Sequence, residues 1–282
     1  MNILLVNASA PTYNLALAKA ARWWQRQGAT VDVAKDVATL FRYDAVWISA
    51  VFSWHVPRLI GMALDALAYG AAEVEVGGPG TFGPRDLIKE RTGLTPRYLP
   101  DCRFDREPGR YAMVFWSRGC PAMNCSLGYP RDGQSPICLV PAIEGVRYTL
   151  YPDTEPAPVI LDNNLSALPR PHQELMVEKT LAAGFRRVDA NSGFEPHSFR
   201  LWTAELWRRL PLLAWRFAYD ELAERKAVLR TIDLLDEAGV PRRRLRIYCL
   251  AGNEPVEVCE QRVLEIQSWG CLPIVQRLRP LD

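Results

Sequence analysis

The feature that most constrains this chain is a group of three closely spaced cysteines. Cys120, Cys125 and Cys138 fall within nineteen residues, directly after the apolar run 112–116, which predicts a β-strand. Three thiolates on a loop after a strand suit an iron–sulfur cluster, because such clusters take cysteine ligands. Three ligands are one fewer than the usual four, so one iron of the cluster would have no cysteine ligand and could bind another molecule. Two other interpretations remain: a structural zinc site, or three unrelated buried cysteines.

Composition excludes several classes of protein. The chain has 282 residues, enough for one large or two small domains, and a net charge of +2 gives no electrostatic case for nucleic acid or an anionic membrane. No apolar run approaches the roughly 20 residues that span a bilayer. Seven cysteines, an odd number, do not suggest a secreted disulfide scaffold. We therefore expect a cytoplasmic protein without a membrane partner.

The first hundred residues alternate between strand and helix patterns. Alternation of this kind predicts a parallel sheet with right-handed crossovers, and so a small Rossmann-like domain over residues 1–100. The predicted strands are 2–7, 30–33, 45–52 and 73–76, and the predicted helices are 14–27 and 57–67. The proline-rich residues 83–111 read as a connecting segment, with 87–92 as a short helix.

The same alternation resumes at residue 112 and can be counted. Six strands are predicted: 112–116, 159–161, 187–189, 215–218, 245–250 and 273–278. The helices between them are 172–183, 199–209, 223–238 and 256–269.

Polar clusters or glycines follow most of these strands. In α/β barrels, functional groups collect at the carboxyl ends of the strands, so the repetition predicts a site there. The residues concerned are Asp162, Asn163, Asn164, Asn191, Ser192, Arg216, Asp220, Leu250 and Gly252.

The cysteine loop resembles that of the radical S-adenosylmethionine (radical SAM) enzymes. Their cluster motif is commonly Cys-x3-Cys-x2-Cys, in a setting such as Arg-Gly-Cys-Pro followed by Cys-x-Val-Pro-x-x-Glu-Gly. This chain has Arg118-Gly119-Cys120-Pro121 and Cys138-x-Val140-Pro141-x-x-Glu144-Gly145, but its spacing is Cys-x4-Cys-x12-Cys. The turn-rich residues 128–137 read as an inserted loop, and removing them restores the family's spacing of two residues between the last two cysteines.

The resemblance implies an α/β fold: a partial (βα)6 TIM-like barrel over residues 101–282, with a linker at its start. It implies a [4Fe-4S] cluster held by Cys120, Cys125 and Cys138, whose open iron binds the amino and carboxylate groups of SAM. Reductive cleavage of SAM would yield a 5′-deoxyadenosyl radical that abstracts hydrogen from an unknown substrate. The electron would come from an external donor such as flavodoxin or ferredoxin.

The strand ends then become candidates for SAM binding, with no catalytic residue beyond the cluster ligands. Asp162, Asn163 and Asn164 stand where the family has the turn that meets the SAM amino group. Asn191 and Ser192 could bond a ribose or carboxylate, and Arg216 offers a fork for the SAM carboxylate or a partner for Asp220. Asp220 could accept from ribose hydroxyls, and Leu250 and Gly252 would lie against adenine.

Three questions stay open at this level. The turn Gly77-Gly78-Pro79-Gly80-Thr81 resembles one in cobalamin-binding domains, but the chain has no Asp-x-His-x-x-Gly motif, so we expect a domain without a corrinoid. The alternatives for the whole protein are a cobalamin-dependent radical SAM methyltransferase and a non-catalytic module stabilised by a metal or cluster. Cys102, Cys249, Cys259 and Cys271 are scattered, and a second cluster on them is an alternative to buried free thiols.

Overall fold

The computed structural model of the protein describes residues 1–37, 43–98, 104–121 and 138–278. The chain forms two compact units, Met1–Tyr111 and Ala112–Arg279. Residues 104–111, expected as a linker, belong to the first unit, where Phe104 packs in a core with Ile3 and Leu5.

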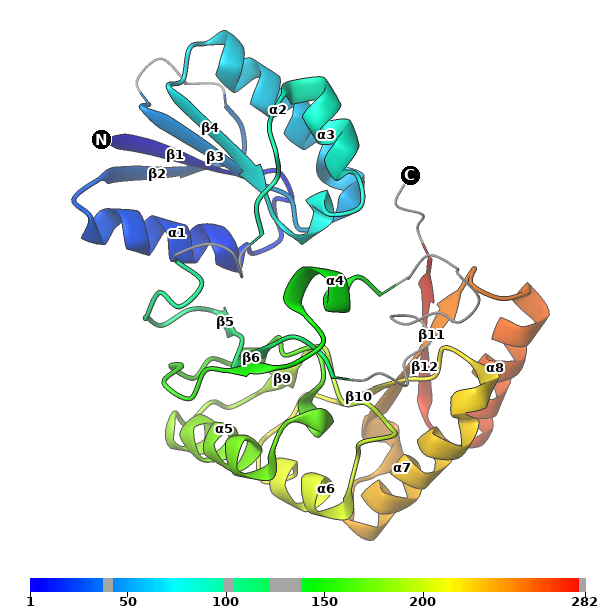
Figure 1. Ribbon diagram of the computed structural model, residues 1–282. Helices are drawn as coiled ribbons and strands as arrows, with labels where there is room; N and C mark the ends of the chain where they lie inside the picture. Colours follow the sequence, from blue (N-terminus) through cyan, green and yellow to red (C-terminus); the bar gives the residue numbers. More distant parts are fainter. Residues whose placement is uncertain (38–42, 99–103, 122–137, 279–282) are drawn as a thin grey trace. The chain divides into compact units, whose positions relative to one another are not determined.

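The first unit is a four-stranded parallel sheet with helices on both faces (Figure 1). Its strand order is β2-β1-β3-β4, so the order reverses between β1 and β3. Side chains alternate across the sheet: Ile3 and Leu5 of β1 pack with α1, whereas Leu4 and Val6 pack with α2. The elements are β1 (Asn2–Asn7), α1 (Leu15–Arg26), β2 (Thr30–Ala34), β3 (Ala45–Ser49), α2 (Val56–Ala68), β4 (Glu73–Gly77) and α3 (Arg85–Thr92).

The second unit also alternates between strands and helices. Two three-stranded parallel sheets have the orders β5-β8-β9 and β10-β11-β12, and an isolated parallel bridge joins Val188 to Leu212 between them. The parallel strands and their helices are β5 (Met113–Val114), β8 (Val159–Ile160), α5 (Arg170–Ala182), β9 (Asp189–Ala190), α6 (Leu201–Trp207), β10 (Trp215–Ala218), α7 (Arg225–Glu237), β11 (Leu245–Ala251), α8 (Val256–Ser268) and β12 (Leu272–Arg277).

Each of the six predicted strands of this unit corresponds to one of these parallel strands. Across the described residues no pairing between β5 and β12 closes the strands into a barrel. The class that the structure shows is therefore α/β with parallel sheets, and the size of a partial barrel stays a prediction.

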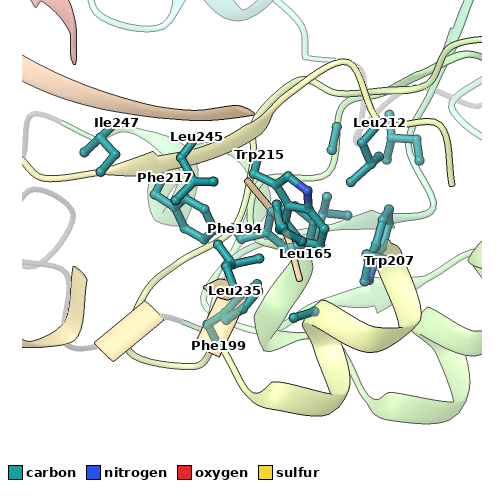
Figure 2. Close-up of a cluster of buried hydrophobic side chains, with 14 of the residues drawn as sticks. Leu165, Phe194, Phe199, Trp207, Leu212, Trp215, Phe217, Leu235, Leu245 and Ile247 are labelled. Carbon is teal, nitrogen blue, oxygen red and sulfur yellow. The ribbon is translucent and has the colours of Figure 1, made fainter. Parts of the chain in front are cut away.

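An aromatic core fixes the helices of the second unit to its strands. Phe194, Phe199, Trp207, Trp215 and Phe217 lie together in Figure 2, with Phe194 5.3 Å from Trp207 and 5.2 Å from Trp215 between ring centroids. All five side chains are buried. Because Trp215 and Phe217 of β10 point into this core, the alternate residue Arg216 faces the other side of the sheet.

Three short elements were not expected. An antiparallel pair, β6 (Ser117–Arg118) with β7 (Thr149–Leu150), and the one-turn helix α4 (Val140–Glu144) surround the segment with the cysteines. The strand predicted over 112–116 ends at Val114. Among the described residues, no helix has the length and apolarity needed to cross a bilayer.

Candidate functional site

The polar segments of the second unit follow the carboxyl ends of neighbouring parallel strands. Residues 162–164 follow β8, residues 191–192 follow β9, and Asp220 follows β10. Residues 250–251 end β11, and Gly252 follows it. The carboxyl ends of parallel strands meet at one edge, where α/β enzymes bind their ligands. Two of the three predicted cluster ligands, Cys120 and Cys138, flank the short elements beside β5 and β8.

The backbone at Gly119 brings the start of the cysteine loop against its end. Gly119 has a φ of 86°, and a side chain there would collide with the carbonyl oxygens of Arg147 and Gly145. The next amide, Cys120 N–H, donates to the Gly145 carbonyl at 3.2 Å. The base of the loop is therefore closed by backbone contacts that only glycine permits.

The carboxylate of Glu144 joins three segments around this base. One oxygen, Oε1, pairs with Arg118 at 3.0 Å, and the other, Oε2, accepts from Gly119 N–H at 3.1 Å and from the Asn163 amide at 2.7 Å. Arg118 is buried and its guanidinium lies 3.4 Å from the centroid of the Phe115 ring. An ion pair this well bonded fixes the relative positions of β6, α4 and the turn after β8.

Cys120 and Cys138 are partly exposed thiols that lie close enough to interact electrostatically. Burial raises the pKa of the Cys138 thiol, the Val140 amide opposes this, and the nearby Cys120, Glu144 and Asp220 raise it further. Cys125 and the predicted insertion 128–137 lie outside the described residues. In the part of the chain that is described, no three His, Cys, Asp or Glu side chains form a metal-binding group. The two thiols present fit a cluster that draws its third ligand from Cys125.

Asp162 is placed differently from the sequence expectation. Its side chain is fully buried, and its two oxygens accept from Trp116 N–H at 2.9 Å and from the Ser117 hydroxyl at 2.6 Å. Burial raises the pKa of this carboxyl to about 6, although both hydrogen bonds oppose the shift. The carboxylate thus ties β8 to the segment before the cysteines.

The next two residues of the turn are also bonded within the protein. Asn163 donates to Glu144, as described above. The oxygen of Asn164 accepts from Ala167 N–H at 3.1 Å and caps a 3-10 helix, Leu165–Ala167, while its nitrogen lies 4.0 Å from the Cys120 sulfur. The side chains of residues 162–164 all contact Cys120 or the segments on either side of the cysteine loop.

Asn191 and Ser192 are exposed at the end of β9. The Asn191 backbone amide donates to Ile160 at 2.9 Å, and the Ser192 hydroxyl donates to the Leu161 carbonyl at 3.1 Å. These bonds leave the Asn191 side chain pointing away from the core, at the carboxyl edge where the prediction placed it.

Arg216 binds a partner that the sequence interpretation did not name. Its guanidinium forms a bidentate ion pair with Asp189 of β9, and its Nε donates to the Tyr248 hydroxyl at 3.2 Å. Both members of the pair are largely covered. Arg216 is therefore held by neighbouring strands and does not pair with Asp220.

Asp220 connects the ends of β10 and β11. Its Oδ1 accepts from Leu250 N–H at 2.8 Å, and burial raises the pKa of its carboxyl. The fully buried Arg262 of α8 donates to the carbonyls of Tyr219 at 2.7 Å and Leu250 at 2.9 Å, and pairs with Glu254 at 3.0 Å. These bonds hold the edge formed by Leu250 and Gly252 in place.

The other described cysteines lie in the core. The sulfurs of Cys249 and Cys259 are 3.8 Å apart beside Arg262, whose nitrogen lies 3.0 Å from the Cys249 sulfur. Burial raises the pKa of Cys249 to about 12 and that of Cys271 to about 11. Cys102, the remaining candidate for a second cluster, lies outside the described residues.

In the first unit, the Gly-Gly-Pro-Gly turn packs against the chain that follows β3. Gly78 has a φ of 98°, and a side chain there would meet the Ala50 carbonyl. A cavity of about 520 Å³ opens beside this turn on the face of the sheet that carries α1. Its walls include Leu17, Trp47 and Phe104, with Ser49 and the carboxylates of Glu73 and Glu75 as polar groups. Burial raises the pKa of Glu75, which pairs with Arg97 at 3.1 Å.

Comparison with solved structures identifies the fold. The chain is similar to a radical S-adenosylmethionine methyltransferase, TsrM from Kitasatospora setae, solved with cobalamin and a [4Fe-4S] cluster bound. The TM-score is 0.70 and the sequence identity 13%, and the match covers 99% of this chain and 75% of that one. No protein-family model matches the sequence, and no curated protein matches it. At this identity the likeness establishes the fold that both chains share.

Two residues of the site were missed or left without a role in the sequence analysis. Glu144 was noted only as part of the resemblance, although it is the residue that joins the loop base. Asp189 was read as an ordinary strand residue, although it holds Arg216. A signal for the second existed, since the strands that carry Asp189 and Arg216 are consecutive in the chain and were both predicted to be parallel.

Proposed function

We propose that this protein is a radical SAM enzyme that acts on a substrate still to be identified. The observation that carries the proposal is that Cys120 and Cys138 lie close enough to interact electrostatically, in a chain whose fold is similar to that of a radical SAM methyltransferase. Cys120, Cys125 and Cys138 would hold a [4Fe-4S] cluster. When bound, such a cluster supplies the electron that cleaves SAM.

The chain's own residues hold and shield this site. Glu144, Arg118 and Asp162 fix the base of the cysteine loop, so that the thiols are presented from a rigid support. SAM would lie along the carboxyl edge, against Asn191, Ser192, Leu250 and Gly252. The backbone of residues 162–164, rather than the Asp162 carboxylate, would meet its amino group. An external one-electron donor of the flavodoxin or ferredoxin type would reduce the cluster.

The decisive assay is anaerobic incubation of the reconstituted protein with SAM and a chemical reductant, followed by measurement of 5′-deoxyadenosine. We expect 5′-deoxyadenosine to form in step with methionine. A protein that binds iron but leaves SAM intact under all reductants would favour the alternative of a cluster-stabilised binding module.

A second candidate, a cobalamin-dependent radical SAM methyltransferase, has two observations in its favour. The similar structure carries cobalamin, and the first unit has a cavity beside the Gly-Gly-Pro-Gly turn at the end of its sheet. Its volume of about 520 Å³ would admit a ring-sized part of a cofactor. Titration of the protein with cobalamin, followed by the visible spectrum, separates the two candidates. A saturable spectral change that Trp47→Ala weakens would support the methyltransferase.

A further inference from the structure

The turn after β8 directs one side chain at a predicted cluster ligand. Asn164 is nearly buried, with an exposure of 6%, and its side-chain nitrogen lies 4.0 Å from the sulfur of Cys120. Amide donors next to cluster sulfurs are among the features that set the reduction potential of iron–sulfur clusters. This contact could therefore set the reduction potential at which the cluster takes up the electron that SAM cleavage requires.

The orientation of the Asn164 amide is determined by its other bonds. Ala167 N–H is a donor only, so the group that faces it at 3.1 Å must be the Asn164 oxygen. The Ser166 hydroxyl lies 3.2 Å from the same oxygen. The NH2 group is therefore the one that faces Cys120.

The support behind Asn164 is rigid on both sides of the contact. Asp162, two residues earlier, bonds Trp116 and Ser117, and Asn163 bonds Glu144, which in turn holds Gly119. Cys120 N–H is fixed by the Gly145 carbonyl. Donor and sulfur thus belong to segments that five further hydrogen bonds hold together.

We propose that Asn164 is a positioning residue for the sulfur of Cys120, to which its amide donates a hydrogen bond that favours the reduced cluster. A donor beside a sulfur ligand stabilises the extra negative charge that reduction adds, so the bond raises the reduction potential. The inference rests on the proposed function, because it takes Cys120 to be a cluster ligand. It adds to that function a residue that controls how readily the cluster accepts its electron.

Two substitutions separate this role from helix capping. Asn164→Asp keeps an oxygen for Ala167 but replaces the donor with a carboxylate, and Asn164→Ser keeps a neutral cap that is too short to reach the sulfur. The matched control is Asn14→Asp in the first unit. Asn14 caps α1 by accepting from Leu17 N–H at 3.2 Å and donates to Ser49 at 2.9 Å, with the same division of oxygen and nitrogen.

The experiment is a potentiometric titration of the reconstituted full-length chain, with the reduced cluster followed by electron paramagnetic resonance. For Asn164→Asp we expect the ratio of reduced to oxidised cluster at a fixed potential to fall about tenfold or more, which is about 59 mV for one electron. Asn164→Ser should shift the potential in the same direction by less, and Asn14→Asp should leave it unchanged. Unchanged potentials in both Asn164 variants, with lowered melting temperatures, would overturn the proposal and leave Asn164 as a cap.

A second readout uses the metal-free chain and stands apart from the proposed function. A donor to sulfur also stabilises a thiolate, so iodoacetamide should alkylate Cys120 more slowly in Asn164→Asp than in wild type, with Cys138 as the internal reference in peptide mass spectrometry. Equal Cys120 rates would overturn the contact itself. A slowed rate in a chain that never binds iron would uphold the contact and refute the proposed function.

Discussion

The three adjacent polar side chains of the turn Asp162-Asn163-Asn164 form hydrogen bonds within the protein. The sequence places them after a strand, which predicts a ligand-binding turn, but their partners lie at residues 116, 117, 120 and 144. No local pattern encodes contacts between residues some 20 to 45 positions apart. The location of the turn could be predicted from the sequence, and the use of its side chains could not.

The buried carboxyl of Asp162 should make stability depend on pH. Its pKa of about 6 lies above the ordinary 3.8, so the folded state holds the proton more tightly than the unfolded state. The free energy of unfolding should therefore fall as pH rises from about 4 to about 6 and level off above, by roughly 3 kcal/mol for this difference in pKa. Asp162→Asn, whose amide can accept from Trp116 and donate to Ser117, should lack this fall.

Denaturant unfolding of the metal-free chain at a series of pH values measures this effect. The exposed Asp153 provides the control substitution, Asp153→Asn, which should keep the wild-type profile. Parallel pH profiles for wild type and Asp162→Asn would show that Asp162 has an ordinary pKa.

We expect the main effect of replacing Arg216 to be a lower free energy of unfolding. Its bidentate pair with Asp189 is largely covered, and removing one partner leaves the other charge poorly compensated. We expect Arg216→Ala to cost about 1–3 kcal/mol of unfolding free energy, and a double-mutant cycle with Asp189→Ala to show coupling of at least about 1 kcal/mol. Equilibrium SAM binding on the same variants tests the earlier prediction of a contact with the SAM carboxylate. If Arg216→Ala leaves the free energy of unfolding unchanged and lowers SAM affinity about tenfold, Arg216 contacts SAM and is not mainly structural.

At the scale of elements, regular helices and buried strands followed from local pattern. Helix α1 illustrates this, since Asn14 caps it by bonding Leu17 N–H and Gly28 follows its end, as its apolar spacing indicated. The pair β6–β7 and helix α4 were not predicted. They are two to five residues long and depend on the Glu144 network and on Gly119, which are tertiary contacts.

The backbone at Gly119 should be essential for the loop that carries the cysteines. Gly119→Ala adds a methyl group against two carbonyl oxygens at a positive φ, whereas Gly184→Ala also has a positive φ, 67°, but meets nothing within 4 Å. We expect Gly184→Ala to cost about 1–2 kcal/mol and to retain full iron binding. Gly119→Ala should lose most of its iron after reconstitution. Equal iron content in the two variants would show that the loop base tolerates rearrangement.

At the scale of the whole molecule, two parallel-sheet units with separate cores reproduce a known fold at 13% identity. Core packing and strand alternation accept many sequences, which explains how two chains can share a fold at this identity. The fold class could be predicted from the sequence because the alternation of strand and helix patterns persists when individual residues change.

The second unit has a core of its own and should fold alone. Its buried cluster, from Val114 to Cys271, contains residues of that unit only. We expect a chain of residues 112–282 to unfold cooperatively and to bind iron after anaerobic reconstitution, as measured by circular dichroism and iron analysis. A fragment that remains unfolded would show that the first unit is required for the second.

We propose that Cys120, Cys125 and Cys138 together hold one four-iron cluster. The most direct measurement is the iron and sulfide content of the anaerobically reconstituted chain and of its single Cys→Ala variants, with Cys271→Ala as the control for a buried cysteine away from the loop. We predict about four irons per wild-type chain, the same for Cys271→Ala, and little or none for each of the three loop variants. Full iron content in Cys138→Ala or Cys120→Ala, or one zinc and no iron in wild type, would contradict the account.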